Sequence, residues 1–102
     1  MRVRAVIVLA EAAEDLEAGR SFYDSREAGV GRYFLDSLMS DLESLQLHAG
    51  IHSVHFGFHR LLSRRFPFAI YYDVTDDLAR VAAILDMRRD PAWIRKELGE
   101  RG

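Results

Sequence analysis

Hydrophobic and polar positions in the first half of the chain indicate one strand followed by two helices. β-Branched and apolar residues dominate residues 3–9 without a helical period, as in a strand buried on at least one face. The apolar residues of 11–27 fall near one helical stripe: Ala13, Leu16, Phe22 and Tyr23. After a turn marked by two glycines, residues 32–47 again carry apolar side chains at helical spacing. The two segments predict an antiparallel helical hairpin.

The second half of the chain is typical of strands. Residues 49–57 contain two glycines and no clear period, so we expect a loop that leads into a strand. Strands are predicted over residues 58–64, 66–74 and 80–85, with a turn at 75–77. In the middle strand, two alternating sets point to opposite faces: Phe66, Phe68, Ile70, Tyr72 and Val74 against Pro67, Ala69, Tyr71 and Asp73.

A last helix is expected from Asp90-Pro91, which matches the preferred N-cap and first helical residue. The element order is therefore β-α-α-β-β-β-α, an α+β fold in one domain, residues 1–102. We expect the helical hairpin to pack on one face of a mostly antiparallel four-stranded sheet, which leaves the other face to the short C-terminal helix, a partner or solvent.

Composition narrows the class of protein. Hydrophobic residues make up 49% of the 102 residues and charged residues 29%, which is typical of a globular domain. The chain has no cysteine, so disulfide scaffolds, thiolate metal sites and cysteine nucleophiles are excluded. No apolar run is long enough for a membrane span or a signal peptide, so we expect a cytoplasmic protein without a membrane partner.

Charge is divided unevenly along the chain. The net charge is −2, but residues 1–56 carry −4 and residues 57–102 carry +2. The arginines of the second half form a candidate basic patch, above all Arg60, Arg88 and Arg89. Such a patch would suit phosphate or carboxylate groups, which guanidinium binds in bidentate fashion. A solvated surface with no function is the alternative interpretation of the same charges.

Four histidines lie within twelve residues, at positions 48, 52, 55 and 59. Their spacing suits one helix face, but Gly50, Val54 and Gly57 disfavour a helix, and we expect no metal site. His59 lies next to Arg60 and is a candidate general base because its ordinary pKa lies near neutrality. A histidine on a loop or surface without a role is the alternative.

Two aromatic residues are candidates for a partner-binding surface. Tyr71 belongs to the second set of its strand, and Trp93 follows closely after the arginines at 88 and 89. Packing beneath the last helix is the alternative for both. The sequence has no GxGxxG, Walker or GxSxG motif, so we expect no cofactor.

Four segments of the chain resemble the ParE/RelE superfamily of bacterial toxin–antitoxin toxins, also called the plasmid stabilisation type. They are residues 60–74, 81–91, 10–16 and 32–38. The resemblance covers nearly the whole chain. It implies the same element order and a cognate antitoxin as partner, in a hetero-oligomer with the toxin. It also places Arg60 and one of Arg88 or Arg89 at the family's basic positions on the strands.

The resemblance implies one of two targets. RelE-like members cut messenger RNA on the ribosome with lysines, arginines and a C-terminal tyrosine, whereas ParE-like members bind DNA gyrase. This chain has a single lysine, Lys96, and Trp93 stands near the place of the tyrosine. Asp86 and Met87 replace the histidine and glycine usual in ParE-like members.

These observations favour a ParE-like toxin that inhibits growth by binding a cellular target and is not an enzyme. The first alternative is a ribosome-dependent endoribonuclease, in which a nearby histidine transfers protons. The second alternative is an interaction module that has kept the fold without toxicity.

Overall fold

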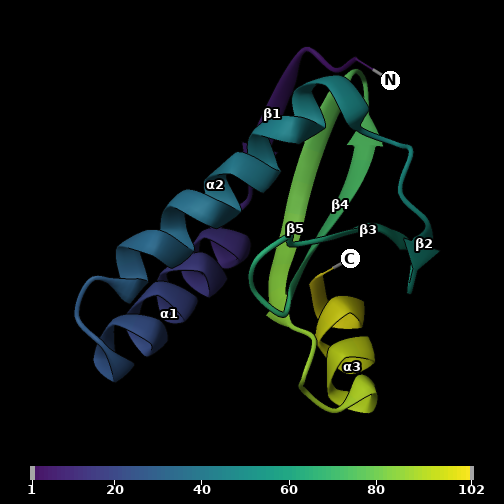
Figure 1. Cartoon of the computed structure of the whole chain (residues 1–102). Coiled ribbons are helices and arrows are strands. Elements are labelled where there is room, and N and C mark those ends of the chain that lie inside the picture. The colour runs from purple at the N-terminus through teal and green to yellow at the C-terminus, as the bar shows by residue number, and fades with distance from the viewer. Residues whose placement is uncertain (1, 102) are drawn as a thin grey trace.

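The computed structural model describes residues 2–101 and confirms an α+β fold (Figure 1). Two long helices lie on one side of a sheet and a short helix lies on the other. The elements are β1 (Ala5–Val8), α1 (Ala10–Arg26), α2 (Val30–His48), β2 (Val54–His55), β3 (Phe58–Leu62), β4 (Phe68–Thr75), β5 (Leu78–Asp86) and α3 (Pro91–Arg101).

The sheet has five strands in the order β1-β5-β4-β3-β2, so the prediction of four strands was wrong in detail. β1 runs parallel to β5, and the other neighbours are antiparallel. The additional strand, β2, lies in the segment predicted as a loop. It pairs with β3 across a two-residue turn in which Phe56 and Gly57 both have positive φ, 55° and 88°.

The alternation predicted for the middle strand is confirmed. One set of β4 side chains packs against α1 and α2 in a core rich in aromatic rings, and we call this side the hairpin face. Phe34 is at its centre, with its ring 4.9 Å from that of Phe68 and 5.0 Å from that of Phe66. The prediction that Ala13 and Phe22 belong to the buried stripe of α1 was wrong, because both are exposed and Ala12 and Gly19 are buried instead.

The opposite side of the sheet, which we call the α3 face, has smaller side chains. Ala69 and Tyr71 of β4 meet Ala83 and Leu85 of β5 there. A register shift between Tyr71 and Tyr72 adds Ala82 to the same cluster. Ile94 and Leu98 of α3 cover these residues, so the short helix completes the second core.

Several element boundaries differ from the predicted ones. β4 begins at Phe68 and not at residue 66, because Pro67 has no N–H for the ladder and its carbonyl instead accepts from the Met87 N–H at 2.7 Å. β5 extends to residues 78–86 through its pairing with β4. Within residues 2–101, no helix has the length and apolar character needed to cross a bilayer.

Candidate functional site

A groove lies between α1 and α3 because the edge of β5 is covered only in part. β1 pairs with β5 from Leu78 to Val81, and no strand within the described residues 2–101 covers the part of this edge that follows. Gly19, on the α1 side of the groove, lets α1 pack closely on Phe34, since a Cβ there would lie 2.5 Å from the Phe34 ring. The resulting hollow of about 340 Å³ is lined by Asp15, Ala18, Gly19, Phe22, Phe68, Ile84, Leu85, Asp86, Arg89 and Trp93.

Arg89 and Trp93, both singled out from the sequence, meet at the rim of this groove. The Arg89 guanidinium lies 3.7 Å from the centre of the Trp93 ring, a cation–π contact. The start of α3 holds the pair in place, because Asp90 caps the helix by accepting the Ala92 N–H at 2.9 Å. The pair presents a positive charge and an aromatic ring side by side.

Arg88 lies nearby but is held by partners within the chain. Its guanidinium donates to the Asp86 carboxylate at 2.7 Å and to the Tyr23 hydroxyl of α1 at 3.4 Å. The ion pair lowers the pKa of Asp86 and raises that of Arg88. A ligand for Arg88 must therefore compete with Asp86.

Arg60 lies on the α3 face of β3, opposite Tyr71 of β4. The Tyr71 side chain is fully buried, and its hydroxyl donates to the Met87 sulfur at 3.4 Å. Burial raises the pKa of Tyr71, and the Arg60 charge opposes that effect in part. The Arg60 Nε is buried and has no hydrogen-bond partner among residues 2–101.

His59 lies on the other side of the sheet from Arg60, because consecutive residues of a strand point to opposite faces. Its ring stacks on that of Tyr72 at 5.1 Å, and its Nδ1 is 2.7 Å from the His52 carbonyl oxygen. The Tyr72 hydroxyl also accepts the Gly50 N–H at 2.9 Å and contacts the His52 Nδ1. These contacts fix the loop before β2.

The surroundings shift the pKa values of two of these side chains, His52 and Tyr72. Burial and the neighbouring His59 and His48 lower the pKa of His52, and burial raises the pKa of Tyr72. Within residues 2–101, no three histidine or acidic side chains are grouped so that they could hold a metal ion.

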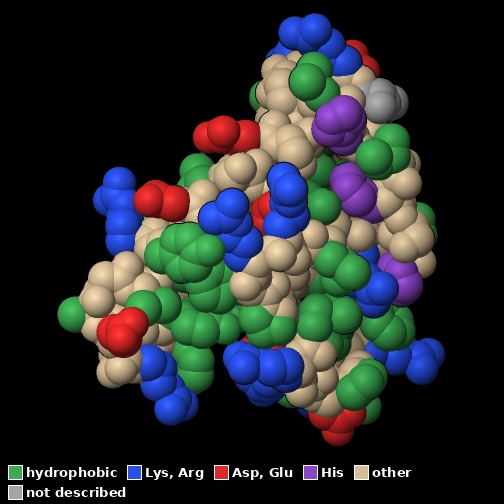
Figure 2. Space-filling view, viewed as in Figure 1, with side chains coloured by type: hydrophobic (Ala, Val, Ile, Leu, Met, Phe, Trp, Pro, Cys, Tyr) green, Lys and Arg blue, Asp and Glu red, His purple; other side chains and the backbone are tan. Residues whose placement is uncertain are grey.

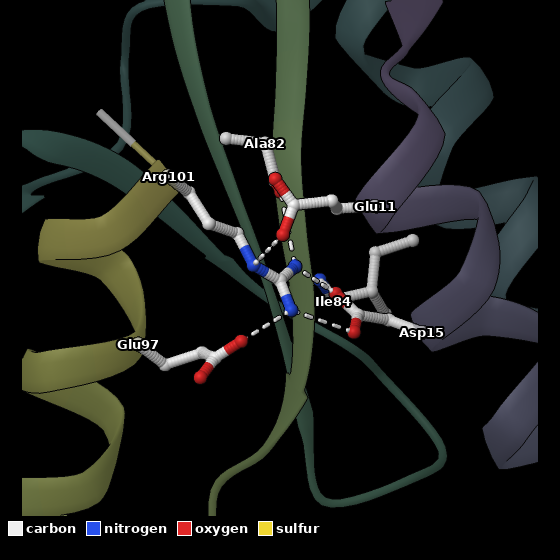
Figure 3. Close-up of polar contacts among 6 residues, drawn as sticks. All are labelled: Glu11, Asp15, Ala82, Ile84, Glu97 and Arg101. Atoms are coloured by element: carbon white, nitrogen blue, oxygen red, sulfur yellow. Dashed lines mark hydrogen bonds and ion pairs between the residues drawn. The ribbon is translucent and has the colours of Figure 1, made fainter.

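An ion-pair network, which the sequence did not reveal, joins α3 to α1 and includes Asp15 of the groove lining (Figure 3). The side chain of Arg101, at the end of α3, is only 6% exposed. It binds both carboxylate oxygens of Asp15 in α1 and, at 2.8 Å, the carboxylate of Glu97. These carboxylates raise the pKa of Arg101. The network ties α3 to α1.

The same network also satisfies the uncovered backbone of β5. Arg101 donates to the Ala82 carbonyl at 3.2 Å, and Asp15 accepts the Ile84 N–H at 3.0 Å (Figure 3). No local pattern in the sequence connects Asp15 with Arg101, because the two residues are 86 positions apart. Helical spacing places Glu97 beside Arg101, which was the only local signal.

The groove combines apolar walls, an arginine on an aromatic ring and two acidic residues. Among residues 2–101, no hydrogen bond joins a histidine to Arg60, Arg88 or Arg89. The arrangement therefore suits the binding of an apolar or aromatic group next to an anion better than it suits proton transfer.

Comparisons with known proteins identify the fold. Neither protein-family models nor curated proteins give a match to the sequence. Among solved structures, the chain is similar to one from the chromosomal ParDE toxin–antitoxin system of P. aeruginosa, with a TM-score of 0.72 and 21% identity. The match covers 78% of this chain and 91% of that chain. The resemblance seen in the sequence is thereby confirmed at the level of the fold.

Proposed function

We propose that this chain is the toxin of a type II toxin–antitoxin pair and acts by binding a target, with DNA gyrase as the first candidate. The observation that carries the proposal is the shared fold over 91% of a chain from a ParDE system. The proposal places the protein in the cytoplasm, where both gyrase and an antitoxin would be present.

The arginines support binding rather than RNA cleavage. Arg88 is engaged by Asp86, and Arg89 lies on Trp93, so within residues 2–101 neither is hydrogen-bonded to a histidine. His59, the candidate base, faces the hairpin side and contacts Tyr72. Arginine and tryptophan are also the residue types that most often dominate the energy of protein interfaces.

A second groove, between β1 and α2, suits the antitoxin. It has a volume of about 560 Å³ and mostly apolar walls, and it contains two opposite charges, Arg4 and Glu43. Its other lining residues are Ala5, Val6, Val8, Met39, Leu42 and Gln46. An amphipathic segment of the antitoxin would bury its apolar face here. Acidic residues of the antitoxin would approach Arg60 and Arg88, so the affinity should fall as salt is added.

The test is to express the chain alone and to measure supercoiling by purified gyrase with the purified chain. We expect growth arrest and loss of supercoiling. The double variant R89A/W93A should bind gyrase at least about 30-fold more weakly, the loss expected for an interface hot spot of about 2 kcal/mol. Arg32→Ala, at an exposed position of α2, is the matched control and should keep full activity.

Other outcomes would overturn the proposal. Translation arrest with cut messenger RNA would indicate the endoribonuclease, and unhindered growth would indicate the interaction module. Full inhibition of gyrase by the R89A/W93A variant would remove the groove between α1 and α3 from the target-binding surface.

A further inference from the structure

The outer edge of the sheet at β2 has unpaired backbone groups. β2 is the last strand of the sheet, and no strand formed by residues 2–101 lies on its outer side. The Arg60 N–H donates to the Ser53 carbonyl at 2.9 Å, which makes these residues a hydrogen-bonded pair of the antiparallel ladder. Because such pairs alternate with non-bonded ones, the N–H and C=O of Val54 point away from β3. They are available to another strand.

The side chains along this edge are apolar and almost without charge. Between residues 47 and 62 the only formally charged side chain is Arg60, which lies on the α3 face. Histidine and hydrophobic side chains lie together down this side of the molecule (Figure 2). The exposed hydrophobic residues here are Leu47, Ile51, Val54, Phe56 and Leu62.

At two residues β2 is very short, which by itself limits pairing, but within residues 2–101 the edge has no charged side chain, proline or covering strand of its own. Exposed edge strands carry charged residues, proline or a covering element when pairing has to be prevented. Val54 is instead 61% exposed, and Phe56 stands exposed at the tip of the turn with a positive φ of 55°. A positive φ is unfavourable for phenylalanine, and an aromatic ring in solvent is unfavourable as well. The turn therefore has both a strained backbone and an exposed ring at the same residue.

The opposite edge of the sheet provides a comparison. The groove beside β1 has Arg4 and Glu43 at its rim, so it selects a partner of complementary charge. The β2 edge has no charge with which to select such a partner. Its complement is another uncharged apolar strand edge, and an identical edge meets that requirement because antiparallel strands pair about a two-fold axis.

We propose that the β2 edge joins two copies of this chain, with Val54 on the two-fold axis. The Val54 N–H of each copy donates to the Val54 C=O of the other, which continues the sheet across both copies. The exposed side chains of Val54 and its neighbours are then buried between the copies. This inference does not depend on the proposed toxin function.

The absence of cysteine makes a direct test available. In a hydrogen-bonded antiparallel pair the facing Cα atoms lie about 5.5 Å apart, which is within the range that a disulfide spans. The Val54→Cys variant should therefore form a disulfide-linked dimer under mild oxidation, visible on a non-reducing gel. Ile7→Cys, on the β1 edge, is the matched control and should remain mostly monomeric.

Sedimentation of the unmodified full-length chain over a hundredfold range of concentration gives an independent measurement. We expect a monomer–dimer equilibrium that Val54→Lys weakens roughly tenfold or more, because like charges face each other across the axis. Ile7→Lys should leave the equilibrium unchanged, and circular dichroism shows whether each variant is folded.

The proposal would be overturned by a wild-type chain that stays monomeric throughout, or by a dimer that Val54→Lys does not affect. Equal cross-linking of the two cysteine variants would also overturn it. If the chain is monomeric but Val54→Lys abolishes binding to another protein, the edge serves a different partner and the two-copy arrangement is wrong.

Discussion

The two faces of the sheet are covered in different ways. On the hairpin face, α1 and α2 bury a cluster of aromatic rings around Phe34, with Phe66 and Phe68 in contact with it. On the α3 face, a helix of eleven residues covers several alanines through two buried apolar side chains, Ile94 and Leu98. Apolar contact dominates the first face. The second face needs the ion pairs of Arg101 in addition.

This difference bears on the candidate site. The groove is bounded on one side by α1, which the aromatic core holds, and on the other by α3. Arg89 and Trp93 lie at the α3 side. The geometry of the site therefore depends on the face with the smaller core. Variants that destabilise one face at a time would show whether α3 and its site residues can be loosened while the rest of the chain stays folded.

The largest expected effect is at the centre of the hairpin face. Phe34→Ala removes a fully buried ring and should lower the free energy of unfolding by about 4 kcal/mol. Urea unfolding followed by circular dichroism measures the change. Met39→Ala, on the same helix but exposed, should change it by less than about 0.5 kcal/mol. Similar effects of the two variants would contradict the assigned core.

A somewhat smaller and more local effect is expected on the α3 face. Arg101→Ala leaves Asp15 without its ion pair and should cost about 3 kcal/mol, as for other buried pairs broken on one side. Hydrogen exchange should accelerate in α3 while α1 and α2 remain protected. Arg95→Ala, at an exposed position of the same helix, is the control. Uniform loss of protection across the sheet would show that the two faces unfold together.

The smallest effect concerns the loop that closes the hairpin face near β2. His52 has a lowered pKa in the folded chain, so the unfolded chain takes up a proton first as the pH falls below about 6.5. Stability should therefore decrease from about pH 8 to about pH 5. Urea midpoints measure this decrease, and His52→Asn should make it shallower than His55→Asn does. Equal slopes in the two variants would exclude His52 as the cause.

Much of the fold follows from local patterns in the sequence. Alternation in residues 66–74 assigned Phe68 and Ile70 to one face and Ala69 and Tyr71 to the other, as the structure shows. The Asp90-Pro91 signal placed the start of α3 correctly. Such patterns work because strand periodicity and helix caps depend only on neighbouring residues.

The remaining features depend on contacts between distant parts of the chain. The parallel pairing of β1 with β5 joins the two ends of the fold, and no local pattern specifies it. Phe22 has helical spacing but is exposed, whereas Ala12 and Gly19 are buried because their small size lets α1 pack closely, with Gly19 directly against the Phe34 ring. Among the site residues, sequence placed Trp93 near Arg89, but it did not reveal that Tyr71 is fully buried or that His59 and Arg60 face opposite sides.

The contact between Asp15 and Arg101 also has a consequence for the order of folding. It closes a loop of 86 residues, whereas the helical hairpin forms from contacts between neighbouring segments. Local contacts form early and distant ones late, because the chain loses more entropy when it closes a longer loop. Replacement of Arg101 should therefore accelerate unfolding and leave the refolding rate nearly unchanged. The lifetime of the native state, rather than the speed of reaching it, is what this arginine controls.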